Sequence, residues 1–330
     1  MADQRKGGIA YCDETWSPAI GCSPVSAGCK NCWAKRQAAR MCGPGKPYEG
    51  LVRDGEWTGK TRLVEGVLDA PLHWRRPRTI LVASMGDLFH ESRSDEDIDR
   101  VFAVMALASW HKFLVLTKRA ERMRVYASGE ARYRIEVVAR RVHVEHCRAC
   151  QDSDEQGVPR PHLNHVILPW PLSIVRLGVS VEDQATADAR IPLLLQTPAA
   201  CRWVSVEPML GPIDLCHLQP GDPPTEIDAL HGTHGVLRPH GGECEHLDHV
   251  VTGGESGPHA RPCDVAWVRD VVRQCREAAV PMCVKQLGSN AYVDVRQNKT
   301  LPGWRRAFRD RAGADPAEWP ADLRVRELPR

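Results

Sequence analysis

The sequence predicts an α/β fold, a TIM-like (β/α) barrel that is either complete or incomplete. Six short apolar runs rich in β-branched residues recur along the chain, each followed by a polar or glycine-containing cluster. Such runs are typical of strands buried on both faces of a parallel sheet. Helical patterns separate several of them, which is typical of a barrel or an open doubly wound sheet. The predicted strands are residues 79–87, 112–118, 177–182, 203–207, 249–255 and 281–286.

Two long helices are predicted between these strands. The first, residues 94–110, begins with Ser94 and Asp97 at capping-box spacing. The second, residues 264–279, begins with Asp264 as its N-cap. Each then carries one apolar stripe that should face the core. The stripes consist of Ile98, Val101, Phe102 and Met105 in the first helix, and of Trp267, Val268, Val271, Val272 and Cys275 in the second.

Length and composition favour one large globular domain. A chain of 330 residues with 42% hydrophobic content can bury a substantial core, and its net charge of +2 says little about partners. No run of eighteen apolar residues occurs, and the first residues are too polar for a signal peptide, so we expect a cytoplasmic protein with no membrane partner. We interpret residues 1–330 as a single barrel domain with insertions at about 129–170 and 217–248 and a C-terminal extension, 287–330.

Charged residues follow the predicted strands at the points where the strands end. Because the site of such folds is built at the carboxyl ends of the strands, these residues should converge in one polar site. Charged residues are also common in exposed loops, but six strands ending in this way favour a site. The charged residues are Asp87, Lys118, Glu182, Glu207, Glu255 and Lys285, and the uncharged amide of Gln286 follows Lys285.

Three clustered cysteines, Cys22, Cys29 and Cys32, are the strongest chemical signal in the chain. A structural zinc ion is almost always closed by four ligands, whereas an iron–sulfur cluster on three thiolates keeps one iron open. Cys12 or Cys42 could close a zinc site, but neither has a paired spacing with the triplet. We therefore favour a [4Fe–4S] cluster over zinc. A glycine precedes each of the first two cysteines, which lets the backbone approach a bulky cluster.

Both predicted insertions are rich in cysteine and histidine. In the first, Cys147 and Cys150 are followed by His162 and His165, a pattern that approaches a zinc-site spacing although the two histidines are closer together than usual. Zinc bound by these four residues is one interpretation. The other is that a basic composition produces such loops without any metal.

Two short segments mix tryptophan with arginine, residues 73–78 and 304–306. Basic residues suit a phosphate backbone and aromatic rings suit stacked bases, so we expect one or the other segment to lie at the rim of the carboxyl-end face and to contact nucleic acid there. Solvated loops with one packed tryptophan are the plainer explanation for either segment alone.

Long strings of the sequence carry a family resemblance that covers most of the chain outside the two insertions. The chain resembles a phage-associated family of three-cysteine-motif proteins, a phage protein domain of unknown function, that is similar to radical S-adenosylmethionine (SAM) enzymes. The strings are TWSPAIGCSPVSAGCKNCWA, SMGDLF, FLVLTKRAERM, LGVSVEDQATADARIPLLLQTPA, WVSVEPMLGPIDL, GGESGPHARP, WVRDVVRQCREAAVPMCVKQLG and DPAEWPADLRVRELP.

The resemblance implies a [4Fe–4S] cluster on Cys22, Cys29 and Cys32 with SAM on the open iron. Reductive cleavage of SAM would then give a 5′-deoxyadenosyl radical that abstracts hydrogen from a substrate, with electrons from a reductase or flavodoxin. The first cysteine gap is six residues where the common pattern has three. The glycine–glycine–glutamate element expected after the second strand is replaced by Gly86 and Asp87, and it occurs late in the chain instead, at residues 253–255.

The same resemblance suggests roles for the strand-end residues. Ser84 and Asp87 are candidates for the methionine amino group, and Glu182 and Glu207 for the ribose hydroxyls. Lys118 or Lys285 would bind the carboxylate or a substrate phosphate. The whole set of candidates comprises Lys118, Glu207, Glu255 and Lys285 as catalytic residues and Ser84, Asp87, Glu182, Gly253 and Gly254 as cofactor-binding residues.

The leading functional hypothesis is therefore a radical SAM-type enzyme acting on a macromolecule, most plausibly nucleic acid, in base modification or lesion repair. Two alternatives come from other classes. One is a non-catalytic, zinc-stabilised nucleic-acid-binding protein. The other is a barrel hydrolase or transferase that uses Glu182, Glu207 and Glu255 as acid and base.

Overall fold

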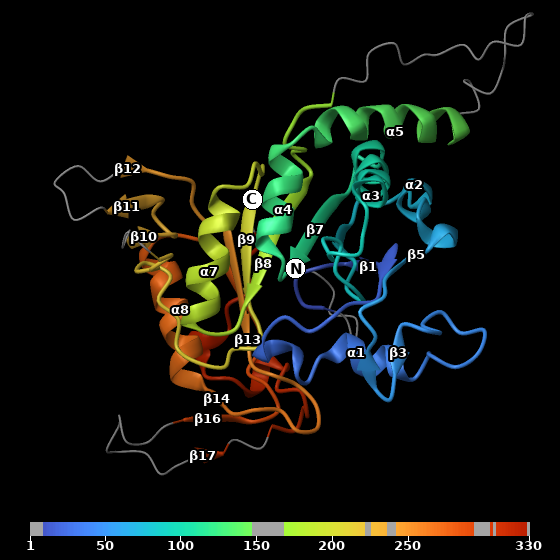
Figure 1. The fold of residues 1–330 in the computed structure, drawn as a ribbon. Helices are drawn as coiled ribbons and strands as arrows, with labels where there is room; N and C mark the ends of the chain where they lie inside the picture. The colour runs from blue at the N-terminus through green and yellow to red at the C-terminus, as the bar shows by residue number, and fades with distance from the viewer. Residues whose placement is uncertain are drawn as a thin grey trace, which may run out of the picture.

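Seven parallel strands form the central sheet of the computed structural model, which describes residues 9–146, 168–221, 226–235, 242–293, 304–305 and 308–328 (Figure 1). Their order across the sheet follows the chain, and β1 and β15 form the two edges without pairing to each other. The sheet is thus an open, curled half-barrel, as the incomplete form of the prediction expects. The strands are β1 (Glu14–Trp16), β6 (Thr79–Val82), β7 (Lys112–Thr117), β8 (Val175–Val181), β9 (Arg202–Val206), β13 (His249–Gly253) and β15 (Met282–Gln286).

All six predicted strands are confirmed, and the central sheet contains one more strand that was not predicted. The missed strand, β1, has only three residues, and it pairs with β6 in parallel register from Glu14 opposite Ile80 to Trp16 opposite Val82. A run this short has no apolar periodicity, so its strand conformation depends on the neighbour that it joins.

Helices cover the convex face of the sheet, and both predicted long helices are confirmed. The Ser94 hydroxyl accepts a hydrogen bond from the backbone N–H of Asp97, and the Asp264 carboxylate accepts one from the backbone N–H of Ala266. The predicted stripes are buried, except that Trp267 is half-buried. The helices are α1 (Trp33–Ala39), α2 (Ala70–His73), α3 (Asp95–Leu107), α4 (Ala120–Ser128), α5 (Ala131–His146), α7 (Gln184–Leu195) and α8 (Val265–Glu277).

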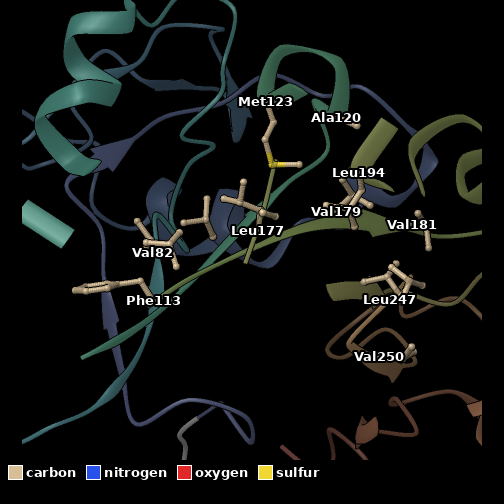
Figure 2. Packing of buried hydrophobic residues seen from close by; sticks show 14 of the residues in the cluster. Val82, Phe113, Ala120, Met123, Leu177, Val179, Val181, Leu194, Leu247 and Val250 are labelled. Carbon is tan, nitrogen blue, oxygen red and sulfur yellow. The ribbon is translucent and has the colours of Figure 1, made fainter. Parts of the chain in front are cut away.

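The main core lies between the sheet and these helices. Figure 2 shows Leu177 of β8 next to Met123 of α4 and Val179 next to Leu194 of α7, with Val82 and Phe113 of neighbouring strands in the same cluster. Alternate residues of each strand point to this side because side chains in a strand alternate between the two faces.

The concave face of the sheet is divided into an apolar half and a polar half. Toward the amino ends of the strands, the segment around Tyr11 covers an apolar cluster, and the Tyr11 and Trp203 rings have centroids 5.7 Å apart. A side chain at Gly178 would collide with Trp203, because an ideal Cβ there lies 2.5 Å from the indole nitrogen. Toward the carboxyl ends, the concave face carries the polar residues of the candidate site. The apolar cluster also includes Leu81, Leu114, Val251 and Cys283.

Small sheets and turns fill the connections, and the C-terminal segment returns to the open edge of the half-barrel. The N–H of Val284 in β15 donates to the carbonyl of Val325 at 2.9 Å, which covers an otherwise unpaired strand edge. None of the helices in the described ranges is long and apolar enough to cross a membrane. The remaining strands are β2 (Ala19–Ile20), β3 (Val52–Arg53), β4 (Glu56–Trp57), β5 (Arg62–Leu63), β10 (Glu226–Asp228), β11 (Thr233–Gly235), β12 (Gly242–Glu243), β14 (Cys263–Asp264), β16 (Ala291–Val293) and β17 (Trp304–Arg305).

Candidate active site

The three-cysteine loop lies across the carboxyl ends of the central strands. It joins β2 to α1, and a parallel bridge between Gly21 and Gly86 fixes its first residues beside the end of β6. Gly86 has no room for a side chain, because an ideal Cβ would lie 2.7 Å from the Ala19 carbonyl. Cys29 and Cys32 follow on the turn that enters α1, as the sequence predicts.

Arg119, directly after β7, ties the first cysteine to the sheet. Its buried guanidinium donates to Asp87 at 3.0 Å, to the Ser23 hydroxyl at 2.8 Å and to the Cys22 sulfur at 3.7 Å. Burial, together with the charge of Asp87, raises the pKa of the Cys22 thiol to about 12, while Arg119 acts in the opposite direction. Arg119 is thus the cation that offsets the charge of a Cys22 thiolate.

Glu182, directly after β8, holds the middle of the loop. Its fully buried carboxylate accepts a hydrogen bond from the Ser26 hydroxyl at 2.8 Å and pairs with Lys118 and with Arg190, the latter at 3.2 Å. Burial opposes ionisation, but these partners outweigh it and lower the pKa of Glu182. Gly28 lets the loop pack on this carboxylate, since an ideal Cβ would lie 2.4 Å from its Oε1.

Glu255, just after β13, holds the end of the loop. It accepts a hydrogen bond from the Asn31 side chain at 2.9 Å and a bidentate pair from Arg261 at 2.7 and 3.0 Å. Arg261 also donates to the carbonyl of Ala27 at 2.8 Å. Burial opposes ionisation here too, but the hydrogen bonds from Arg261 and Asn31 lower the pKa of Glu255.

A second group of strand-end residues lines the concave face beneath the loop. Lys285 pairs with Glu207 at 3.1 Å, and the Lys118 ammonium donates to the Ser180 hydroxyl at 2.7 Å. The side chains of Lys118 and Lys285 stay 19% and 28% exposed, although the ammonium group of each is paired with a carboxylate. Glu207 also accepts from the Ser205 hydroxyl at 3.1 Å.

The structure therefore brings the predicted strand-end residues together, but in two roles. Asp87, Glu182 and Glu255 are buried in contacts that hold the cysteine loop, whereas the side chains of Lys118, Glu207 and Lys285 are partly exposed. Their assignments to SAM groups stay predictions. The other three candidates are close-packed: the Ser84 hydroxyl pairs with that of Ser17 at 3.2 Å, Gly253 abuts Glu207, and Gly254 abuts the Leu287 backbone.

The analysis of the sequence missed the partners of the buried carboxylates. Arg119 is next to the predicted Lys118, and Arg261 lies six residues after Glu255. Because arginines are common on loops, neither position indicates in the sequence that the arginine pairs with a buried carboxylate. The other missed partners are Ser26, Asn31, Ser180, Arg190 and Ser205.

The three sulfurs of the loop do not form one compact group of donor atoms in the structure. Zinc–sulfur bonds of about 2.3 Å place the sulfurs of a tetrahedral site roughly 3.8 Å apart. Within the described ranges, the only group of three or more metal-ligating side chains with all donor atoms inside 4.8 Å lies elsewhere, so the three loop sulfurs are spread more widely. Cys42 donates to the Ala39 carbonyl, and Cys12 packs against the apolar half of the concave face.

The predicted zinc residues Cys147, Cys150, His162 and His165 lie outside the described residues.

The basic and aromatic segment 73–78 was predicted to lie at the rim of the carboxyl-end face, and this placement is wrong. Residues 74–78 lead into β6 from its amino end, where the backbone of Arg78 hydrogen-bonds to Lys112 at the start of β7. Trp304 and Arg305 form β17, which pairs with β16 beyond the end of β15.

Fold and site together define an open, parallel (β/α) half-barrel whose strand ends hold a three-cysteine loop. The chain belongs to the family described as "Protein of unknown function (DUF5131)", whose profile matches residues 6–312. No curated protein and no solved structure gives a significant match.

Proposed function

We propose that the protein is a radical SAM-type iron–sulfur enzyme that acts on a macromolecule, with nucleic acid as the substrate class. The observation that carries this proposal is the position of the cysteine loop. Separate residues after β7, β8 and β13 hold the loop over the carboxyl ends of the strands, the face where (β/α) folds build their active sites. A loop that served only as a structural clamp would not need this placement.

In this proposal Cys22, Cys29 and Cys32 hold a [4Fe–4S] cluster, which leaves one iron for the amino and carboxylate groups of SAM. The bound pair would supply a one-electron reduction of the sulfonium and a carbon radical that abstracts hydrogen. The chain's own residues position these groups. Arg119 offsets the charge at Cys22, and the partly exposed side chains of Lys118 and Lys285 are the cations that would bind a carboxylate or phosphate.

The wild-type protein tests the proposal directly. After anaerobic reconstitution we expect about four irons per chain, and reduction in the presence of SAM should yield 5′-deoxyadenosine. The measurements are iron and zinc content, the electron paramagnetic resonance signal of the reduced protein with and without SAM, and chromatography of the nucleoside product. A chain that holds one zinc ion on this loop, or a full cluster that yields no 5′-deoxyadenosine, would rule the proposal out.

The substrate class is supported by exposed residues on the loop itself. Trp33 directly follows Cys32, and its side chain is 49% exposed beside the exposed Lys30. Base stacking on an aromatic side chain contributes about 1–3 kcal/mol per base. We therefore expect Trp33→Ala to weaken binding of single-stranded DNA or RNA by about fivefold to a hundredfold, measured by fluorescence anisotropy across a salt series.

Trp110 provides a matched control for this measurement. It is also exposed, at 41%, but it lies just before β7, at the amino ends of the strands, where its indole donates to the Trp74 carbonyl at 2.7 Å. Trp110→Ala should leave the affinity unchanged. The proposal that the substrate is a nucleic acid would be wrong if both variants lost the same affinity. It would also be wrong if the affinity changed neither with salt nor with either substitution.

A further inference from the structure

A cysteine, an aspartate and a histidine meet in the segment between β9 and β13. The sulfur of Cys216, a carboxylate oxygen of Asp228 and a ring nitrogen of His231 all lie within 4.8 Å of one another. Nδ1 of His231 is 2.7 Å from Oδ2 of Asp228. No other such group occurs among the residues that the structure describes.

Backbone hydrogen bonds hold the three side chains in place. Leu218 and Ile227 exchange both of their backbone hydrogen bonds at 3.0 Å, which fixes the strand that ends at Asp228 against the residues after Cys216. Oδ1 of Asp228 accepts from the backbone N–H groups of Leu230 and His231, both at 3.0 Å. Oδ2 of Asp228 therefore faces His231, and the donor atoms are already held close together without a bound ion.

We propose that Cys216, Asp228 and His231 bind a Zn²⁺ ion. Thiolate, imidazole and carboxylate are the three ligand types that zinc takes in proteins, and bond lengths of about 2.0–2.3 Å require donor atoms roughly 3–4 Å apart. The observed group needs only small side-chain adjustments to reach that geometry. Binding displaces the thiol proton of Cys216 to solvent, and water takes the fourth position.

The position of this site, far from the cysteine loop, indicates a stabilising role separate from the proposed activity, although its three protein ligands are one fewer than structural zinc sites usually have. His231 lines a shallow hollow together with Asp248 and Pro281, which directly precede β13 and β15. The ion would therefore sit at the amino ends of the strands, opposite the cysteine loop, at the face of a (β/α) fold that serves stability. It would clamp the segment that connects the neighbouring strands β9 and β13, whose own strands have only two or three residues each.

The test uses the full-length chain, first stripped of metal with a chelator and then titrated with Zn²⁺, with Co²⁺ as a spectroscopic probe. Wild type should bind one more equivalent of zinc than Cys216→Ser or His231→Ala. The zinc affinity of this site should fall at least about a hundredfold in each variant, because even loss of an outer partner costs 10–100-fold. The four-coordinate cobalt spectrum should lose one thiolate in Cys216→Ser.

His217→Ala is a closely matched control, because His217 lies in the same segment and pairs through Nδ1 with an aspartate three residues earlier, Asp214, at 2.9 Å, but is not part of the group. It should keep the full zinc content. The melting temperature of wild type should also rise with zinc, and that rise should be absent in His231→Ala, which separates metal binding from a general folding defect. Unchanged zinc content in Cys216→Ser and His231→Ala, or an equal loss in His217→Ala, would overturn the proposal.

Discussion

Replacing Cys29 by alanine is expected to reduce iron content to a small fraction of the wild-type value and 5′-deoxyadenosine formation to background. With only two thiolates left, the loop cannot hold a cluster that the chain binds through three, and neighbouring backbone groups are no substitute for a thiolate. The same result is expected for Cys22→Ala and Cys32→Ala. Iron analysis and product chromatography after parallel anaerobic reconstitution measure both effects.

Cys42→Ala is the matched control for this experiment. Cys42 is another half-buried free thiol near the end of α1, but its sulfur donates to the Ala39 carbonyl and takes no part in the loop. This variant should retain full iron content and full activity. If a loop variant kept its cluster, or if Cys42→Ala lost it, the assignment of the three ligands would be wrong.

The sheet could be predicted from the sequence because its strands are buried on both faces. Each of the six predicted runs carries consecutive apolar residues that no exposed segment would tolerate, and the caps at Ser94 and Asp264 form within a few residues of chain. Local chemistry determines these features. The strand β1 could not be predicted because three residues are too few to show an apolar periodicity. Its strand conformation depends on pairing with β6.

The site could be predicted as a set of residues but not as a set of roles. Parallel topology alone brings strand ends to one face, which is why Asp87, Glu182 and Glu255 meet the cysteine loop. Whether a carboxylate faces a ligand or a guanidinium depends on partners elsewhere in the chain, and Arg119 is 32 residues from Asp87. The basic segment 73–78 was misplaced for another reason, because it precedes its strand and so lies at the opposite end.

The proposed zinc site lies beyond what spacing can reveal. Its three ligands come from a loop, a strand end and a turn, and Cys216 stands twelve residues before Asp228 with no paired spacing. Asp228 and His231 lie on the β10–β11 hairpin, but Cys216 does not. Backbone hydrogen bonds of Leu218 with Ile227 and of Ala229 with Leu215 bring the cysteine to the other two ligands, and no spacing rule predicts that pairing.

The buried charges after β7 and β8 lead to the largest expected effect on stability. Glu182 is fully buried between two cations, Lys118 and Arg190, whose side chains are 19% and 10% exposed. Glu182→Gln keeps the shape and an acceptor for the Ser26 hydroxyl, but it removes the charge that both cations share. Breaking a buried pair by neutralising one partner costs about 3–5 kcal/mol, so we expect the free energy of unfolding to fall by about that amount at pH 7.

The pH dependence of this loss gives a second, independent readout. The pKa of Glu182 is lowered in the folded protein, so its contribution to stability is complete above the unfolded-state pKa of about 4.3 and disappears as the pH falls through the folded-state pKa. The difference between wild type and Glu182→Gln should therefore be constant from neutral pH down to about 4.3 and shrink below it. Denaturant unfolding at a series of pH values measures this difference.

Glu65→Gln is the control that separates a buried charge from an ion pair as such. Glu65 pairs bidentately with Arg100, but its side chain is 66% exposed, so water screens the charges and the variant should unfold close to wild type. Because a neutral amide accepts the hydrogen bond from Ser26 more weakly than a carboxylate does, Glu182→Gln should hold the cysteine loop less firmly and lower iron incorporation in the folded variant, whereas Glu65→Gln should not. If the two variants lost the same small amount of unfolding free energy, Lys118 and Arg190 would have other partners available. If they also kept equal iron content, the loop would not depend on the Glu182 carboxylate.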